Sequence, residues 1–227
     1  MSSAATTLRV RHVDLSYAAR VEPPAFDLGA RWVELQSAIY SSFAPLGVKL
    51  SDIKHESGAG PADLALACWI LDHGAVVRFR LDKVEVWSNS ASFAAEAVQV
   101  SDVVERAIAV LHAASPEARV VSHALTLALH AAVDGASPPS VADYITRTPA
   151  GSPEMIPNGV SFLCQLASGS GTGLVVFERS GLVADGAFLR ISSEQVGSVS
   201  VRDAFDSATG FLQAAVQRLG FALAWEA

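Results

Sequence analysis

An internal repeat constrains this chain more than any other feature of its sequence. The segment VQVSDVVERAIAVLHAA, which begins at Val98, aligns with VSVRDAFDSATGFLQAA, which begins at Val199, with seven identities in 17 positions. Every matched pair lies at an offset of 101 residues. A match of this length at a fixed offset predicts that one structural unit occurs twice.

Upstream segments keep the same order. LALACWIL aligns with VSFLCQLA, which places Cys68 on Cys164, and GAVV is followed in the second copy by GLVV. LRVRHVDLSYAARV resembles RVVSHALTLALHAAV, with His12 opposite His123. We therefore expect one domain, residues 1–227, built from two repeats of about 7–115 and 119–223.

Each unit is expected to contain a strand, a helix, a three-strand meander and a closing helix. The predicted fold class is α+β: a tandem duplication of a β-α-β-β-β-α unit. Its sheet of about eight strands is largely antiparallel, with helices packed on one face and a pseudo-twofold relation between the copies. SHALTLALHAAV has the composition of a helix, but the repeat assigns residues 119–133 to a strand.

The hairpin in VVRFRLDKVEVW has the clearest alternation of apolar and polar residues. We expect its turn at Asp82-Lys83. On the core face this register pairs Leu81 with Val84 and Phe79 with Val86. On the other face it pairs Arg80 with Glu85 and Arg78 with Trp87.

Four further segments are expected to be helical. Trp32, Leu35, Ile39 and Phe43 form an apolar stripe in ARWVELQSAIYSSF, and SVADYITRT is its shorter equivalent in the second copy. The closing helices are expected to begin near Asp102 and Asp203, which would act as caps. Loops are expected from Ser51 to Pro61 and on either side of SVADYITRT, at Ser137-Pro138-Pro139 and in the proline-broken run from Pro149 to Pro157.

This layout resembles other duplicated folds in which helices lie on a curved sheet, of which the TATA-box-binding proteins are one example. The resemblance is one of architecture, without shared motif residues, and it implies nothing about partners. Sixteen basic and 23 acidic side chains give a net charge of −7, so we expect neither nucleic acid nor an anionic membrane as a partner.

Composition also suggests the compartment. No apolar stretch approaches the roughly 20 residues that a membrane-spanning helix needs, and the first residues do not have the pattern of a signal peptide. The two cysteines, Cys68 and Cys164, lie in apolar segments and are expected to be buried thiols. We therefore expect a soluble, cytoplasmic protein.

Motifs that would indicate catalysis are weak. The glycine-rich run from Ser168 to Gly173 precedes a predicted strand, whereas a phosphate-binding loop leads into a helix, so we interpret it as a hairpin connection. His123 and His130, seven residues apart, are expected on opposite faces of a strand. His55 and His73 have no visible nucleophile partner in the sequence. The sequence therefore assigns no catalytic residue, metal site or cofactor and favours a protein that is not an enzyme.

One cluster stands out as a candidate binding site: Arg78, Arg80, Glu85 and Trp87, which are expected on a single sheet face. It is either a surface salt bridge beside a tryptophan or a recognition patch, because arginine and tryptophan are enriched in interface hot spots.

Two functions remain open on this basis. The first is a non-catalytic interaction or regulatory protein that acts through self-association or a protein partner. The alternative is a binding protein or enzyme for a small apolar ligand held between sheet and helices. The candidate lining of such a site is Phe43, Trp69, Phe79, Phe162 and Phe177.

Overall fold

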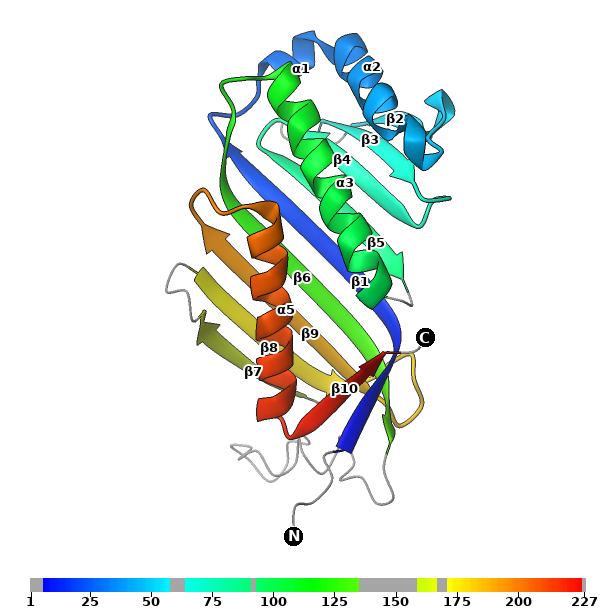
Figure 1. Cartoon of the computed structure of the whole chain (residues 1–227), viewed down its shortest axis with the longest axis vertical. Coiled ribbons are helices and arrows are strands. Elements are labelled where there is room, and N and C mark those ends of the chain that lie inside the picture. The colour runs from blue at the N-terminus through cyan, green and yellow to red at the C-terminus, as the bar shows by residue number, and fades with distance from the viewer. Residues whose placement is uncertain (1–5, 58–63, 91–92, 135–158, 167–170, 226–227) are drawn as a thin grey trace.

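The computed structural model describes residues 6–57, 64–90, 93–134, 159–166 and 171–225 (Figure 1). Within these residues the chain forms one mixed α+β structure around a ten-stranded sheet. The loops expected at 137–139 and 149–157, and the helix expected in SVADYITRT, lie outside the described residues. No helix in the described ranges is long and apolar enough to cross a membrane.

The strand order is β2-β3-β4-β5-β1-β6-β9-β8-β7, and β10 pairs with β1. All pairings are antiparallel except that of β10 with β1, which is parallel. The largely antiparallel α+β fold is therefore confirmed. The strands are β1 (Thr6–Glu22), β2 (Ile53–Glu56), β3 (Ala65–Ile70), β4 (Ala75–Arg80), β5 (Lys83–Ser90), β6 (Arg119–Asp134), β7 (Gly159–Gln165), β8 (Gly171–Arg179), β9 (Ala187–Val196) and β10 (Phe221–Trp225).

Helices cover one face of this sheet. Figure 1 shows α2 (Trp32–Phe43), α3 (Phe93–Ala114) and α5 (Val201–Arg218) on the same side, with the short α1 (Asp27–Ala30) before α2. The apolar stripe of α2 is buried as predicted at Leu35, Ile39 and Phe43. We call the side of the sheet that none of the described helices covers the open face.

The buried residues of α3 recur in α5 at the offset found in the sequence. In α3 they are Val103, Val104, Ala107 and Leu111, and in α5 they are Ala204, Phe205, Ala208 and Leu212. Both stripes pack into the same core as the inward residues of the strands. Both closing helices therefore turn an apolar face toward the core.

The long strand β1 shows how sequence alternation builds the two faces. Val13, Leu15 and Tyr17 are buried against the helices, whereas Ser16 between them is exposed on the open face. A β-bulge between Val10 and His12 shifts the alternation by one residue, so Val10 and Val13 both point into the core. The strand assignment of residues 119–133 is confirmed, because β6 pairs with β1 along most of its length.

The structure corrects three predictions about element boundaries. Asp102 lies inside α3, and α5 is capped by Ser200, whose hydroxyl oxygen accepts a hydrogen bond from the Asp203 amide. Residues 53–56, expected in a loop, form the edge strand β2, so the first meander has four strands where the predicted unit has three. A four-residue strand gives too short an alternation to be recognised in sequence.

Candidate functional site

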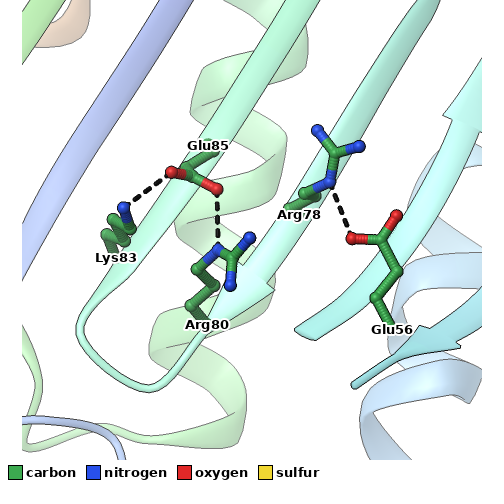
Figure 2. A network of polar contacts seen from close by, with 5 residues as sticks. All are labelled: Glu56, Arg78, Arg80, Lys83 and Glu85. Atoms are coloured by element: carbon green, nitrogen blue, oxygen red, sulfur yellow. Dashed lines mark hydrogen bonds and ion pairs between the residues drawn. The ribbon is translucent and has the colours of Figure 1, made fainter. Parts of the chain in front are cut away.

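The four candidate residues all lie on the hairpin of β4 and β5, on the open face. Arg80 Nε donates to Glu85 Oε2 at 2.8 Å, and Lys83 Nζ lies 2.7 Å from Glu85 Oε1. Arg78 Nε donates to Glu56 Oε2 at 2.8 Å (Figure 2). Glu56 comes from β2, so sequence analysis missed it when it assigned that strand to a loop. The two arginines are thus each held by a carboxylate.

The register of this hairpin differs from the predicted one by two residues. Arg78 lies opposite Glu85, and Val76 lies opposite Trp87, because the turn is centred on Leu81-Asp82. Backbone contacts from the end of β1 and from the segment that follows it fix this turn: Val21 N donates to Asp82 O, and Ala25 N donates to Leu81 O. A shift of two residues preserves the faces, so the four candidate residues remain together.

Charge balance around Glu85 favours its ionised form. Burial of the carboxyl opposes ionisation, but hydrogen bonds and charges from Lys83 and Arg80 outweigh it, so the pKa of Glu85 lies below its usual value. The side chains of Arg80 and Glu85 are 21% and 26% exposed. The pair is therefore partly shielded from solvent, and both charges persist at neutral pH.

Trp87 is the exposed aromatic residue of this cluster. Its side chain is 40% exposed, and it lies between Val76 on β4 and Ser16 on β1. Val76 is in turn opposite Trp69 on β3, so two tryptophans flank one valine that is only 4% exposed. Lys54 Nζ lies 5.1 Å from the centre of the Trp69 ring, a cation–π distance.

These residues begin a row that crosses eight strands of the open face. Thr126 and Ser192, near its middle, are joined by a hydrogen bond of 2.9 Å between their hydroxyls. Leu163 at the far end, on β7, is 80% exposed. In spatial order the row contains Trp69, Val76, Trp87, Ser16, Thr126, Ser192, Leu174 and Leu163, each opposite the next. We call it the cross-strand row.

Trp69, a candidate lining residue of a ligand site between sheet and helices, instead belongs to the open face. Its neighbours Cys68 and Ile70 point into the core, and alternate residues of a strand face opposite sides. The segment LALACWIL is apolar throughout, so its sequence gives no indication of which residues face the helices. Phe43, Phe79 and Phe177, also proposed as ligand lining, are fully buried in the packed core.

The histidines divide between the two faces. His123 is 3% exposed on the helix side, whereas His12 and His130 are partly exposed and lie opposite each other on the open face. The prediction that His123 and His130 lie on opposite faces is confirmed. The alignment of His12 with His123 is wrong as a structural equivalence, because it places residues of opposite faces together.

His130 has a serine beside it that sequence analysis did not single out. Ser180 Oγ lies 2.9 Å from His130 Nδ1 and accepts hydrogen bonds from the amides of Leu182 and Val183. A hydroxyl oxygen with two amide donors has its lone pairs occupied and is a poor nucleophile. This arrangement fixes a turn and orients the imidazole.

The two thiols differ in environment. Cys68 is fully buried, as expected, and burial raises the pKa of its thiol to about 12. Cys164 was also expected in the core but is partly exposed on β7. Within the described ranges, no three histidine, cysteine, aspartate or glutamate side chains come together as a metal site.

Comparison with known proteins adds little. No family model and no curated protein matches the chain. Among solved structures, TBP of Methanococcus jannaschii has a TM-score of 0.29 and 12% sequence identity, over 91% of this chain and 99% of that chain. A likeness at this TM-score carries no argument about fold or function.

Proposed function

We propose that the protein is a non-catalytic interaction or regulatory protein that binds a protein surface through the open face of its sheet. A second copy of the chain is the first partner to test. The observation that carries this proposal is the cross-strand row, in which Trp87 and Leu163 remain 40% and 80% exposed on a face that no described helix covers. Exposed apolar side chains gathered on one face are typical of interaction sites.

The size of the open face is adequate for such a role. Eight strands spaced about 4.8 Å apart span roughly 34 Å, and six residues of strand span roughly 20 Å, which gives about 680 Å² in projection. A standard interface buries about 800 Å² on each partner. The open face is therefore of the right order for one complete interface.

The side chains of the open face suit binding with little reordering. Arg78 and Arg80 are already held by Glu56 and Glu85, so their side-chain entropy is partly lost before any partner arrives. Trp87 has only two side-chain torsions, and tryptophan and arginine are enriched among residues that dominate binding energy. The paired arginines would orient a partner around Trp87.

We also propose that the two halves, residues 7–115 and 119–223, are tandem copies related by a pseudo-twofold axis between Ser16 and Thr126. The cross-strand row supports this proposal, because it has the same number of strands on each side of that axis. Residues at equal distances from the axis are Trp87 and Ser192, Val76 and Leu174, and Trp69 and Leu163. One half then presents aromatic residues where the other presents smaller ones. A partner would therefore bind in one orientation.

Native mass spectrometry and sedimentation at several protein concentrations test this function. We expect the unmodified protein to self-associate and Trp87→Ala to weaken association without changing the melting temperature. Tyr40→Ala is the matched control, because Tyr40 is also 40% exposed but lies on α2. A monomer at every concentration would exclude a second copy as the partner. Unfolding of Trp87→Ala would show that Trp87 is structural.

The proposal includes a cytoplasmic location, which the two free thiols, Cys68 and Cys164, support. The alternative function, binding of a small apolar ligand, is supported by a different feature on the helix side of the sheet.

A further inference from the structure

A groove lies between α5 and the strands β7 and β8, on the side of the sheet away from the open face. Its volume is about 490 Å³, within the roughly 300–1,000 Å³ that ligand sites occupy. It is lined by Phe162, Leu163, Cys164, Val175, Phe211, Ala214, Ala215, Arg218 and Leu219.

The floor of the groove depends on a close approach of helix and strand. A Cβ atom at Gly173 would lie 2.5 Å from the Phe211 ring, so the ring rests directly on the backbone of β8. Cys164 is opposite Gly173 across the β7–β8 pair. The Phe211 ring and the backbone of Gly173 thus form the apolar floor of the groove, and Cys164 lies next to it.

The lining combines a long apolar surface with a single charge. Eight of the nine lining side chains are apolar, and the ninth is Arg218, in the last turn of α5. Within the part of the chain that the structure describes, Arg218 has no hydrogen-bond or ion-pair partner. A guanidinium binds a carboxylate through two parallel hydrogen bonds. A ligand complementary to this groove therefore has one anionic group attached to an apolar body.

We propose that this groove binds a single-chain amphiphile with a carboxylate head, of the class of medium-chain fatty acids. The alkyl tail lies along Phe162, Val175 and Phe211, and the carboxylate contacts Arg218. This site lies on the helix side of the sheet and contains neither Trp87 nor the arginine pairs, and Leu163 at the β7 edge is the one residue that the groove lining shares with the cross-strand row. The variants at Arg218 and Ala214 therefore test the groove without altering the open face. Failure of one proposal leaves the other unaffected.

The probes are decanoate, decanol and decylamine, which share a chain and differ in the head group. Isothermal titration calorimetry measures binding to the full chain below the concentration at which the probes aggregate. The second readout is alkylation of Cys164 by iodoacetamide, followed by intact mass. Cys68 is the internal control, because it is fully buried and its pKa is raised to about 12. We expect saturable binding of one decanoate per chain that slows alkylation of Cys164.

Two pairs of variants separate the head and tail contacts. Arg218→Gln should weaken decanoate binding about tenfold, equivalent to about 1.4 kcal/mol, and leave decanol unchanged. Arg202→Gln, at the opposite end of α5 and outside the groove, should change neither. Ala214→Leu should fill the groove and abolish binding of both probes, whereas Gln213→Leu, the adjacent exposed position, should not.

Several results would overturn this inference. Equal affinities for decanoate, decanol and decylamine would show that the groove does not recognise a carboxylate. An unchanged decanoate affinity in Arg218→Gln would show the same. Binding that persists in Ala214→Leu, or that never saturates, would exclude the groove as the site. Protection of Cys164 that grows with protein concentration in the absence of any probe would show that a second copy occupies the groove instead. Melting temperatures of all four variants confirm that each is folded.

Discussion

The hydroxyl of Tyr17 on β1 lies 2.5 Å from Nδ1 of His123 on β6, in the buried layer between the sheet and α5. Burial raises the pKa of Tyr17, which keeps its hydroxyl protonated. Burial lowers the pKa of His123, and a backbone hydrogen bond at Val199 offsets part of that effect. Neutral His123 therefore accepts the hydrogen bond that Tyr17 donates. The contact joins the two central strands beneath Phe205, which stacks on Tyr17 at 5.6 Å.

The stability of the protein should fall as the pH drops below about 6.5, the ordinary histidine pKa. In that range the unfolded chain binds a proton at position 123 that folded His123 does not bind, so acid favours unfolding. His123→Asn keeps an acceptor oxygen for Tyr17 but cannot titrate. Urea titrations across this range should give a shallower dependence of the unfolding free energy on pH in this variant. An equal slope would show that His123 protonates freely in the folded state.

His130 adds a second contribution of the same sign. Burial lowers the pKa of His130, the charge of His12 lowers it further, and together they outweigh the charge of Asp14, which raises it. A His130→Asn variant therefore serves as the companion measurement. In this variant the unfolding free energy should also depend less steeply on pH. The double variant, His123→Asn with His130→Asn, should lose the pH dependence that both histidines contribute.

Two glycines near α5 should respond to alanine in opposite directions. Gly173→Ala forces the Phe211 ring to move and should lower the unfolding free energy by about 1–3 kcal/mol. Gly210→Ala, in the interior of α5 with nothing within 4 Å of the added methyl group, should raise it by about 0.5–1 kcal/mol. Adding Phe211→Ala to Gly173→Ala removes the overlap. If Gly173→Ala alone were neutral, the helix would be looser than the structure shows.

Ser200→Ala should cost about 1 kcal/mol, because the hydroxyl of Ser200 satisfies the free amide of Asp203 at the start of α5. Ser41→Ala is the control. Its hydroxyl donates to the Ser37 carbonyl within α2, and alanine is at least as favourable in a helix. Thermal unfolding of both variants measures the difference. Equal melting temperatures would contradict the assignment of Ser200 as the cap.

Glu85→Gln should lower the unfolding free energy at neutral pH by about 1 kcal/mol or less, because the ion pairs with Arg80 and Lys83 are partly exposed. The lowered pKa of Glu85 means that its contribution is present above the ordinary glutamate pKa and is lost as the pH falls through the folded value. The difference in unfolding free energy between Glu85→Gln and the unmodified protein should therefore disappear in acid. A difference that persists there would point to packing instead of charge.

Much of the fold follows from local patterns. Alternation identified β4 and β5, and the repeat identified β6 despite its helical composition. The register of the β4–β5 hairpin did not follow, because the amides of Val21 and Ala25 select the turn from outside the hairpin. The sequence of the hairpin alone cannot predict a contact with a distant segment of the chain.

The candidate site was only partly visible for the same reason. Arg78, Arg80, Glu85 and Trp87 share a face, as alternation predicts, but Glu56 and Trp69 reach that face from strands whose sequences give no alternation. The groove beside α5 was missed except for Phe162. Its lining comes from β7, β8 and α5, and only the folded chain brings these elements together.

The placement of β1 has a consequence for how the chain folds. Its three partners are β5, β6 and β10, so the first of the described strands pairs with the last. The β1–β10 pairing joins residues more than 200 positions apart, as Thr6 and Phe221 show, and it requires closing a long loop before any contact is gained. Synthesis of the first half leaves the long edge of β1 that β6 will occupy unpaired. β1 therefore completes its pairing only when the strands of the second half have formed.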